Sequence, residues 1–394
     1  MSHKVCVAGV GMIPFKKPGA SEHYDVMAAQ AVRLALKDAG IAYDQVQQIY
    51  AGHAFGASTC GQKALYKVGM SGALIINVNN NCSTGSSALF LARQAVQSGA
   101  VEVALAVGFE EMSPGALSSP WNDRPHPLDE FIKVIDDVLG PVELPNALKL
   151  FGAAGQAHMK QYGTAMETFA QIRAKASRHA ANNPLAVFRN VVTPEEVMNE
   201  KVIWPGVMTR SMACPPTCGA AAAIVVSEAY AQKHGLRSDV QIVGQSLMTD
   251  FPSTLDSKDP IRVVGFDMAQ AAAKAAYEQA GIGPQDVDVV ELHDCFAHNE
   301  LITYEALGLC PEGGGEKLVR DGDNTYGGRY VTNPSGGLLS KGHPLGATGL
   351  AQCYELTHQL RGSAEQRQVA NARVALQHNL GLGGACVVTV YQKH

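Results

Sequence analysis

The sequence predicts an α/β protein made of two similar layered halves, with an additional segment inserted in the first half. Three observations predict this fold class. A segment near the N-terminus repeats after a shift of 241 residues, helical patterns alternate with apolar strands in both copies, and the residues from Ser113 to about Met208 occur only in the first copy. Strands that alternate with helices are typical of layered α/β proteins with largely buried sheets.

The repeat places Met27–Phe55 on Met268–Phe296 without a gap, and nine of the 29 positions are identical. Each copy predicts an Ala-rich helix that ends at an Ala-Gly pair, followed by a turn and an apolar strand. Asp25 and Asp267 stand near the two helix starts, where we expect them to act as N-terminal caps. The two predicted strands are Val46–Ala51 and Val287–Leu292.

The repeat continues more weakly on both sides of this segment. Val5–Gly9 and Ile242–Gly244 are the expected opening strands, and Ala220–Val226 and Cys386–Val390 are the expected closing strands. Between them, the strand Ile75–Val78 leads through a polar turn into the helix Thr84–Gln97. Its counterpart is the Gly-rich turn Ser335–Gly346, which leads into the helix Thr348–Leu360. Cys82 and His343 therefore occupy matching places, just before these two helices.

The extra sequence in the first half is rich in Pro and Asn and contains patches of helix-forming residues. It predicts an inserted loop domain that covers part of the molecule. We expect three units: residues 1–112 with 209–240 as the N-terminal half, residues 113–208 as the insertion, and residues 241–394 as the C-terminal half.

Composition excludes several classes of protein. The 394 residues carry 31 Lys and Arg against 36 Asp and Glu, a net charge of −5, and 46% of them are hydrophobic. This apolar content is too high for a disordered chain, and the length suggests more than one core. Because no Lys- or Arg-rich run occurs, we expect no nucleic-acid partner. No stretch approaches 18 uncharged apolar residues, so we expect no membrane span.

Nine cysteines, an odd number, favour free thiols in a reducing compartment. Cys214 and Cys218 have no second pair with zinc-site spacing, so we expect no structural zinc. The N-terminus has no charged-then-apolar leader, and a cytoplasmic location is predicted. A peroxisomal location is the alternative for a eukaryotic source, although Tyr391–His394 is not a Ser-Lys-Leu signal.

Cys82 is the first candidate for chemistry. It lies in Asn79–Gly85, where a strand ends, a polar turn follows and a helix begins. A thiol at this place faces unpaired backbone N–H groups and the positive end of the helix dipole, so we expect a lowered pKa and a nucleophilic thiolate. The alternative is a small buried residue, but the polar flank Asn79–Asn81 is unusual for a core.

His343 is the second candidate, in the segment Ser340–Gly349. Pro344 suits a first helical position, while Gly342 and Gly346 allow the backbone to approach a ligand closely. A neutral imidazole here could deprotonate a thiol that the other half brings to it. The alternative is a histidine in a surface turn, and the matching placement with Cys82 favours the functional interpretation.

Two further motifs follow strands of the second half. His293-Asp294-Cys295 comes directly after a buried strand, where sites form in α/β sheets. Neighbouring residues of a strand point to opposite faces, so a metal bound by all three is disfavoured. The Gly-rich segment Asn379–Ala385 can present backbone N–H groups to an oxyanion, but it lacks the Lys and Ser/Thr of a phosphate loop. Cys353 and Cys386 are expected in the core.

Together these motifs resemble those of the thiolase superfamily, in the branch associated with sterol carrier protein. The resemblance runs from Val5 to Tyr391 and rests mainly on four segments in the same order. These segments are Asn79–Gly85, His293–Phe296, Gly342–Gly349 and Asn379–Gly384. It implies a thiolase-like fold of two duplicated α/β halves with an inserted lid.

The resemblance also implies an activity. Thiolases are acyltransferases that cleave a 3-oxoacyl-CoA with free CoA through a cysteine-bound acyl group, and some run the reverse condensation. Carried over, Cys82 is the nucleophile, His343 takes its proton, and Cys295 protonates the departing acyl-CoA enolate. His293 and His343 serve the enolate oxygen, and the backbone N–H groups of Cys82 and Gly383 serve the oxyanion of the tetrahedral adduct. Cys386 is out of register and should be inert.

In this interpretation coenzyme A is a co-substrate, no cofactor is permanently bound, and the insertion forms a lid over coenzyme A. Candidate phosphate ligands are the basic residues of the insertion, although a solvated helix face is the alternative for most of them: Lys149, Lys160, Arg173, Lys175 and Arg178. Cys218 departs from the family pattern, which usually has Asp there, and leaves the local coenzyme A contacts open. A homodimer is expected by analogy.

Three alternatives remain to be weighed against a degradative thiolase that acts on straight, 2-methyl-branched or steroid side-chain acyl groups. A retro-aldol relative lacks the nucleophilic cysteine, so Cys82 with His343 argues against it. A ketoacyl synthase shares the fold, but the motif His293–Phe296 disfavours it. A non-catalytic acyl-CoA or sterol carrier has no need of a nucleophile, so the complete set Cys82, His293, Cys295 and His343 speaks against it.

Overall fold

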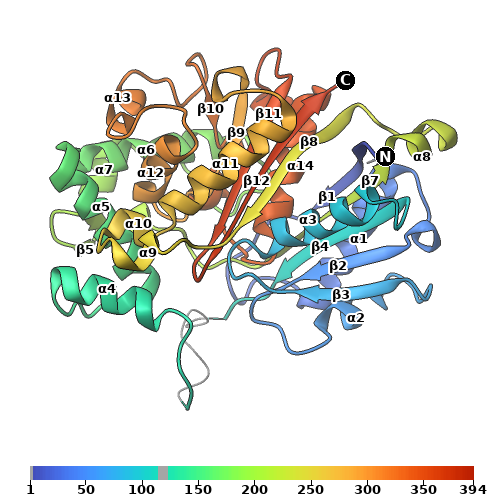
Figure 1. Ribbon diagram of the computed structural model, residues 1–394, viewed down its shortest axis with the longest axis horizontal. Helices are drawn as coiled ribbons and strands as arrows, with labels where there is room; N and C mark the ends of the chain where they lie inside the picture. Colours follow the sequence, from blue (N-terminus) through green and yellow to red (C-terminus); the bar gives the residue numbers. More distant parts are fainter. Residues whose placement is uncertain (1–2, 114–122) are drawn as a thin grey trace.

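The computed structural model of the chain describes residues 3–113 and 123–394, so the first part of the predicted insertion, residues 114–122, lies outside the described residues. One ten-stranded sheet runs through the molecule, and helices cover it (Figure 1). Its strand order is β10-β9-β11-β12-β8-β1-β7-β4-β2-β3. The prediction of an α/β fold is confirmed.

The first half supplies five strands of the sheet. Its elements are β1 (Val5–Met12), α1 (Tyr24–Ala39), β2 (Gln48–Gly52), α2 (Cys60–Leu65), β3 (Leu74–Val78), α3 (Thr84–Gln97), β4 (Val103–Glu110), β7 (Gly219–Ser227) and α8 (Glu228–His234). β2 is parallel to β3 and β4, whereas β7 is antiparallel to β4 and β1.

The second half supplies the other five strands in the same arrangement. Its elements are β8 (Val240–Met248), α9 (Ser253–Asp256), α10 (Pro260–Val263), α11 (Phe266–Ala280), β9 (Val289–Glu291), α12 (Ala297–Ala306), α13 (Gly315–Arg320), β10 (Val331–Thr332), α14 (Thr348–Arg361), β11 (Val374–Gly381) and β12 (Ala385–Lys393). The strand order reads the same from both ends, and the two halves meet where β1 lies antiparallel to β8. The duplication seen in the sequence is therefore a duplication of structure.

The two repeated helices end as predicted but begin differently. α1 and α11 stop at Gly40 and Gly281, which adopt the left-handed conformation and return their N–H groups to the last helical turn. The residues at the cap positions are His23 and Gly265, so the prediction that Asp25 and Asp267 are N-caps is wrong. Both carboxylates lie inside the first turn, where they still oppose the positive end of the helix dipole.

Between β4 and β7 the chain forms α4 (Asp129–Leu139), α5 (Asn146–Tyr162), α6 (Met166–Ala181), α7 (Pro194–Met198), β5 (Val202–Trp204) and β6 (Met208–Thr209). These elements belong to the first half in sequence but lie beside α10, α12 and α13 of the second half (Figure 1). Buried side chains of α5, α6, α11 and α12 form one apolar core. Within the described residues, no helix has both the length and the apolar character needed to cross a bilayer.

Helices α3 and α14 meet at their N-terminal ends, and two glycines make this close approach possible. A Cβ added to Gly85 would lie 2.7 Å from the Gly346 carbonyl oxygen and 3.1 Å from the Gly349 nitrogen. A Cβ added to Gly349 would lie 2.3 Å from the Ser86 nitrogen. Because side chains are absent at these positions, the residues that precede the two helices come together.

Candidate active site

Cys82 lies in the turn between β3 and α3, at the place that the sequence predicted. Asn81, directly before it, has a left-handed φ of 51°, and the hydroxyl groups of Ser83 and Thr84 bond back to the carbonyl groups of Asn80 and Asn81. The thiol is half-buried at the start of the helix. The polar turn therefore fixes the cysteine at the helix end instead of placing it in the core.

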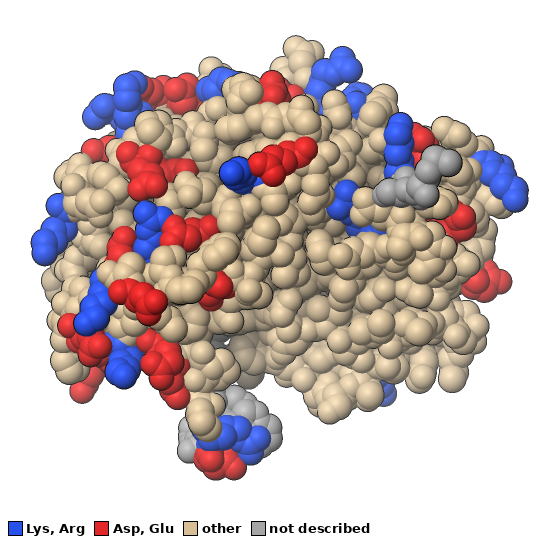
Figure 2. Space-filling view, viewed as in Figure 1, with Lys and Arg blue, Asp and Glu red and all other residues tan. Residues whose placement is uncertain are grey.

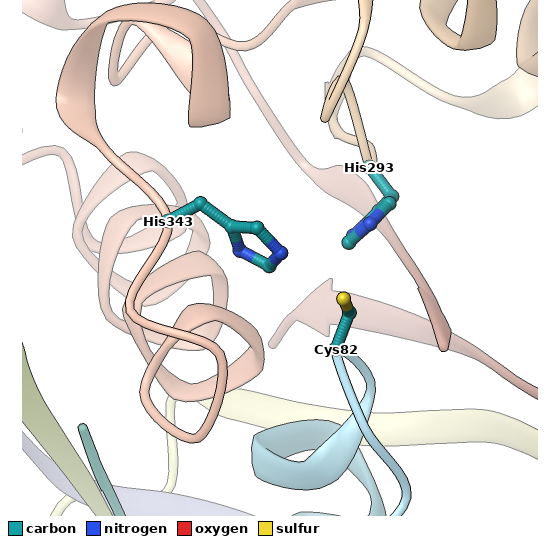
Figure 3. A group of neighbouring side chains, drawn as sticks. All are labelled: Cys82, His293 and His343. Carbon is teal, nitrogen blue, oxygen red and sulfur yellow. The ribbon is translucent and has the colours of Figure 1, made fainter. Parts of the chain in front are cut away.

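The structure brings Cys82 together with His293 and His343. One donor atom from each residue, the Cys82 Sγ and a ring nitrogen of each histidine, lies within 4.8 Å of the other two. The imidazole rings are 5.0 Å apart between centroids and nearly perpendicular, at 83°. Figure 3 shows the three side chains pointing toward one another from different segments of the chain. The predicted meeting of Cys82 and His343 across the two halves is present.

His343 is buried and held from two sides. Its Nδ1 lies 2.6 Å from the Thr348 Oγ1, and its backbone N–H donates to the Thr217 Oγ1. Among the described residues, no hydrogen-bond partner contacts its Nε2. A buried ring nitrogen without a partner is available to a proton donor that enters or already faces the site.

The His343 loop is also tied to the first half by Glu110, a buried residue at the end of β4. Its carboxylate accepts hydrogen bonds from the backbone N–H groups of Ala54, Phe55 and Gly346, each at 3.0 Å. Burial raises the pKa of this carboxyl. Sequence patterns did not single out Glu110, because its three partners are distant in sequence.

His293 follows β9 and is almost fully buried. Its Nδ1 lies 3.0 Å from the Asn379 Nδ2. The next residue, Asp294, points elsewhere, because its carboxylate accepts the backbone N–H groups of Leu338 and Leu339. The side chains thus alternate as expected for a strand end, and within the described part of the chain the three donors grouped closely enough to approach one metal ion are Cys82, His293 and His343.

The pKa of the Cys82 thiol differs from the predicted one. Burial, with the Glu110 carboxylate as a second cause, raises the pKa of the thiol to about 12. The expectation of a lowered pKa is wrong, because desolvation of the thiolate outweighs the helix dipole. Burial lowers the pKa of His343 to about 3, with Lys341 as a second cause, and burial also lowers that of His293 well below its usual value. Thiol and imidazoles therefore all rest in their neutral forms.

Cys295 is buried beside the site, and a second cysteine accompanies it. The Cys214 backbone N–H donates to the Cys295 carbonyl oxygen at 2.8 Å. Burial raises the pKa of Cys295 well above its usual value, and the neighbouring thiols of Cys214 and Cys82 raise it further. A neutral thiol near the nucleophile can donate a proton. Sequence reasoning considered Cys214 only as a zinc ligand and missed its place beside Cys295.

The Gly-rich segment forms the hairpin between β11 and β12 and lies against the Cys82 turn. The Asn81 Nδ2 donates to the Leu382 carbonyl oxygen at 3.1 Å, and a Cβ on Gly381 would lie 2.2 Å from the Asn80 carbonyl oxygen. Gly383, at the exposed tip, has a left-handed φ of 91°. The hairpin therefore contacts the turn that carries Cys82.

The basic residues expected to bind coenzyme A phosphates are mostly not available. Lys149 and Lys175 are buried and pair with Asp136 and Glu300, and Arg173 is buried with its guanidinium donating to a serine hydroxyl. For these three residues the alternative of a solvated helix face is wrong, and their burial with partners inside the protein disfavours the phosphate role. Buried cations are found with partners because an unpaired one is costly to desolvate. Lys160 and Arg178 are exposed.

Three further cysteines are part of the core. Cys353 and Cys386 are fully buried in α14 and β12, as predicted. Cys218 is also buried, and its Sγ exchanges hydrogen bonds with the backbone N–H and carbonyl groups of Met112. It therefore fastens the start of β7 to the end of the β4 segment.

Comparisons with known proteins agree with this geometry. Residues 5–203 match the family described as "Thiolase, N-terminal domain", and residues 256–392 match "Thiolase C-terminal domain-like". The chain is 54% identical over 393 residues to "Sterol carrier protein 2" of Rattus norvegicus, which covers 99% of this chain and 72% of the relative.

Two solved structures share the fold. One, titled "Ltp2-ChsH2(DUF35) aldolase", is 21% identical and superposes with a TM-score of 0.83 over 99% of this chain and 98% of the other. The second is the human mitochondrial 3-ketoacyl-CoA thiolase in complex with CoA. It is 19% identical, with a TM-score of 0.74 over 100% of this chain and 98% of the other.

Proposed function

The chain belongs to the thiolase family of acyltransferases, and from this premise we propose that it cleaves a 3-oxoacyl-CoA with free CoA. The observation that carries the proposal is the group of the half-buried Cys82 with the buried His293 and His343, in which the thiol lies near a ring nitrogen that has no hydrogen-bond partner among the described residues. A nucleophile beside a base is what covalent acyl transfer requires. Binding of an acyl-CoA without chemistry requires neither.

The first half of the reaction forms an acyl-enzyme. The Cys82 Sγ attacks the 3-oxo carbon while its proton passes to the Nε2 of His343, and the carbonyl oxygen becomes an oxyanion. Backbone N–H groups of Cys82 and Gly383 are the proposed donors to this oxyanion. The adduct collapses by breaking the bond between C2 and C3, which leaves the shortened acyl group on Cys82 and releases the enolate of acetyl-CoA, or of propanoyl-CoA from a 2-methyl-branched substrate.

The enolate needs a proton at carbon and stabilisation at oxygen. Cys295 is the proposed acid, because its raised pKa keeps it protonated. His293 and His343 are the proposed partners of the enolate oxygen. The CoA sulfur then attacks the acyl group on Cys82 while its thiol proton passes to the Cys295 thiolate. The leaving Cys82 thiolate takes back its proton from His343, and the shortened acyl-CoA is released. Coenzyme A is thus a co-substrate and no resident cofactor takes part.

The test is CoA-dependent cleavage of a straight-chain and a 2-methyl-branched 3-oxoacyl-CoA. Cys82→Ala should abolish cleavage and the acyl adduct seen by intact mass spectrometry. Cys295→Ala should slow cleavage strongly, while the matched variant Cys386→Ala should do little. Equal losses from Cys295→Ala and Cys386→Ala would refute the assignment of the acid. Binding of acyl-CoA without any acyl adduct would favour the carrier, and cleavage that survives Cys82→Ala would favour the retro-aldol class.

We also propose that the protein is a homodimer that pairs through β3. Leu74 and Ile76 of this edge strand are 49% and 42% exposed. An exposed apolar strand at the edge of a sheet can pair with a strand of another chain. A hollow of about 710 Å³, lined in part by Tyr50 and Leu91, adjoins the same face. Figure 2 shows few charged side chains over this region, whereas the side where α4, α5, α9 and α10 lie carries many. A second copy is the expected occupant.

Light scattering on the purified protein should give twice the mass of one chain, about 83 kDa in place of 41.6 kDa. Ile76→Lys should shift the mass toward the monomer, because a buried unpaired charge opposes association. Val191→Lys, which alters an exposed apolar residue of the insertion, should not. A monomeric wild-type protein would refute the dimer without touching the proposed chemistry.

A further inference from the structure

Asn379 is a fully buried residue of β11 that contacts both the nucleophile and one of the histidines. Its Nδ2 donates to the Cys82 carbonyl oxygen at 3.1 Å and lies 3.0 Å from the His293 Nδ1. Its Oδ1 accepts the Ser86 hydroxyl at 2.8 Å. One amide therefore links the start of α3 to the end of β9.

The surroundings fix which way this amide points. The Cys82 carbonyl oxygen can only accept, so the amide atom that faces it must be the NH₂ group. The Ser86 Oγ accepts from the Gln377 Nε2 at 2.8 Å, which leaves its hydroxyl hydrogen for the Asn379 Oδ1. A flipped amide would place two acceptors against each other at Cys82. The NH₂ group therefore also faces His293, and the His293 Nδ1 has to accept.

This orientation determines where the proton of His293 lies. A neutral imidazole whose Nδ1 accepts carries its hydrogen on Nε2. His343 has the opposite pattern: its Nδ1 donates to Thr348, whose hydroxyl donates to the Pro344 carbonyl oxygen at 3.1 Å, so its Nε2 is a bare acceptor. The two histidines thus offer one N–H donor and one lone pair to the same small space.

We propose that Asn379 is a positioning residue that sets the tautomer of His293, so that His293 is a hydrogen-bond donor to the reacting oxygen and not a second base. This inference rests on the proposed function for what the donor does, since a developing enolate oxygen needs a donor and not a lone pair. His293 alone could supply either group. The amide from the other end of the Gly-rich segment decides between them.

The same contact opposes metal binding by the Cys-His-His group. A histidine that ligates a metal through Nε2 carries its hydrogen on Nδ1 and donates it to a carboxylate or carbonyl oxygen. Here the Asn379 NH₂ occupies that place, so ligation by His293 would set two N–H groups against each other. Cys82, His293 and His343 have the donor types of a zinc site, and their donor atoms lie within 4.8 Å of one another, so without this amide a small movement would let them bind one ion. Asn379 therefore keeps the nucleophile available in a cell that contains zinc.

Asn379→Asp tests both consequences, because it exchanges the NH₂ group for an oxygen with little change in shape. We expect kcat for cleavage to fall roughly 10²–10³-fold, the usual effect of removing one oxyanion donor. We expect the affinity for Co²⁺, followed by the thiolate charge-transfer absorption, to rise roughly 10–100-fold over the wild type, the usual weight of a residue that orients a metal ligand. Asn183→Asp is the matched control: it also places a carboxylate at a buried asparagine, but one that bonds Ser335 and Leu185 away from the site.

The Co²⁺ readout separates a positioning role from a structural one, since a merely destabilised site gains no metal affinity. Unchanged Co²⁺ affinity in folded Asn379→Asp, or an equal gain in Asn183→Asp, would overturn the proposal. If Asn379→Asp does not fold, the wild type decides: ¹⁵N spectra of the histidine rings, assigned with His293→Gln, should show hydrogen on Nε2 of His293. Hydrogen on its Nδ1 would overturn the proposal. Neither the Co²⁺ affinity nor the ¹⁵N spectrum requires turnover. A wild type that cleaves no 3-oxoacyl-CoA would therefore refute the proposed function but not the assignment of the His293 tautomer.

Discussion

Gly346→Ala should separate the placement of His343 from the stability of the fold. Gly346 lies three residues after His343, and its N–H donates to Glu110 of the first half. A Cβ at this position would lie 2.4 Å from the Phe109 carbonyl oxygen and 2.7 Å from the Gly52 carbonyl oxygen. Both obstacles are backbone atoms of strands in the sheet, so no side chain can rotate away to make room.

The distances give the size of the effect. The closer contact is about 1 Å short of ordinary van der Waals separation, so the loop that carries His343 has to move by about that amount. A misplacement of about 1 Å in a catalytic group can cost roughly 10²-fold in rate. Overpacking of a buried position typically costs about 1–3 kcal/mol of stability, and backbone obstacles place this case at the upper end. We therefore expect kcat to fall about 100-fold in a protein that is still folded.

Gly9→Ala is the matched control. A Cβ on Gly9 would lie 2.4 Å from the Ala39 nitrogen and 2.5 Å from the Ala35 carbonyl oxygen, a clash as severe as that at Gly346 but between β1 and α1. Thermal unfolding should show comparable losses of stability in the two variants. The cleavage assay, run where both are folded, should show a large loss of kcat in Gly346→Ala alone. Equal kcat values would refute the conclusion that this packing contact places His343.

Three further predictions follow from the same contacts. Thr348→Val removes the acceptor of the His343 Nδ1 hydrogen and should lower kcat about tenfold with little change in KM, whereas Thr357→Val on the same helix should not. Because the pKa of His343 is lowered to about 3 and that of Cys82 is raised to about 12, the acylation rate should not change between about pH 5 and 9. A rate that changes around pH 6.5 would contradict the conclusion that the thiol and the imidazole are both neutral before the reaction. Lys175→Met leaves the buried carboxylate of Glu300 without its cation, so chemical denaturation should show that the free energy of unfolding falls by about 3–5 kcal/mol. The KM for CoA should stay unchanged, and a raised KM would show that this lysine does bind a phosphate of CoA.

Sequence reasoning predicted the features that repeat or that follow local rules. The Ala-rich helices and their glycine stops appear where the repeat placed them, and the helix predicted at Thr84–Gln97 has those bounds. The grouping of Cys82 with His343 followed from their matching places before two helices. These features depend on residue patterns within short segments, so the sequence alone is sufficient to predict them.

Contacts between distant segments could not be predicted in this way. In the sequence, Lys175 resembles any exposed basic residue of a helix. Only the structure shows that it is buried against Glu300. Cys214 comes beside Cys295 because the chain returns from the insertion there, and the sequence gives no spacing that signals it. The pKa of Cys82 depends on how much water the fold removes from the thiol, which exceeds the local effect of the helix end.

Besides Cys82 and His343, a second pair of matched positions makes the two halves of the site differ. Under the shift of 241 residues, Gly52 at the end of β2 corresponds to His293 after β9. A Cβ at Gly52 would lie 2.7 Å from the Thr84 Cγ2, so a side chain there would press on the start of α3, directly after Cys82. At the matched place in the second half, the histidine fills the space beside Cys82 and meets Asn379. A histidine at both places would displace the start of α3, which follows the nucleophile, whereas a glycine at both places would leave the site without this donor. Divergence at this position therefore gives the duplicated fold one complete site, with the thiol from one half and the two histidines from the other.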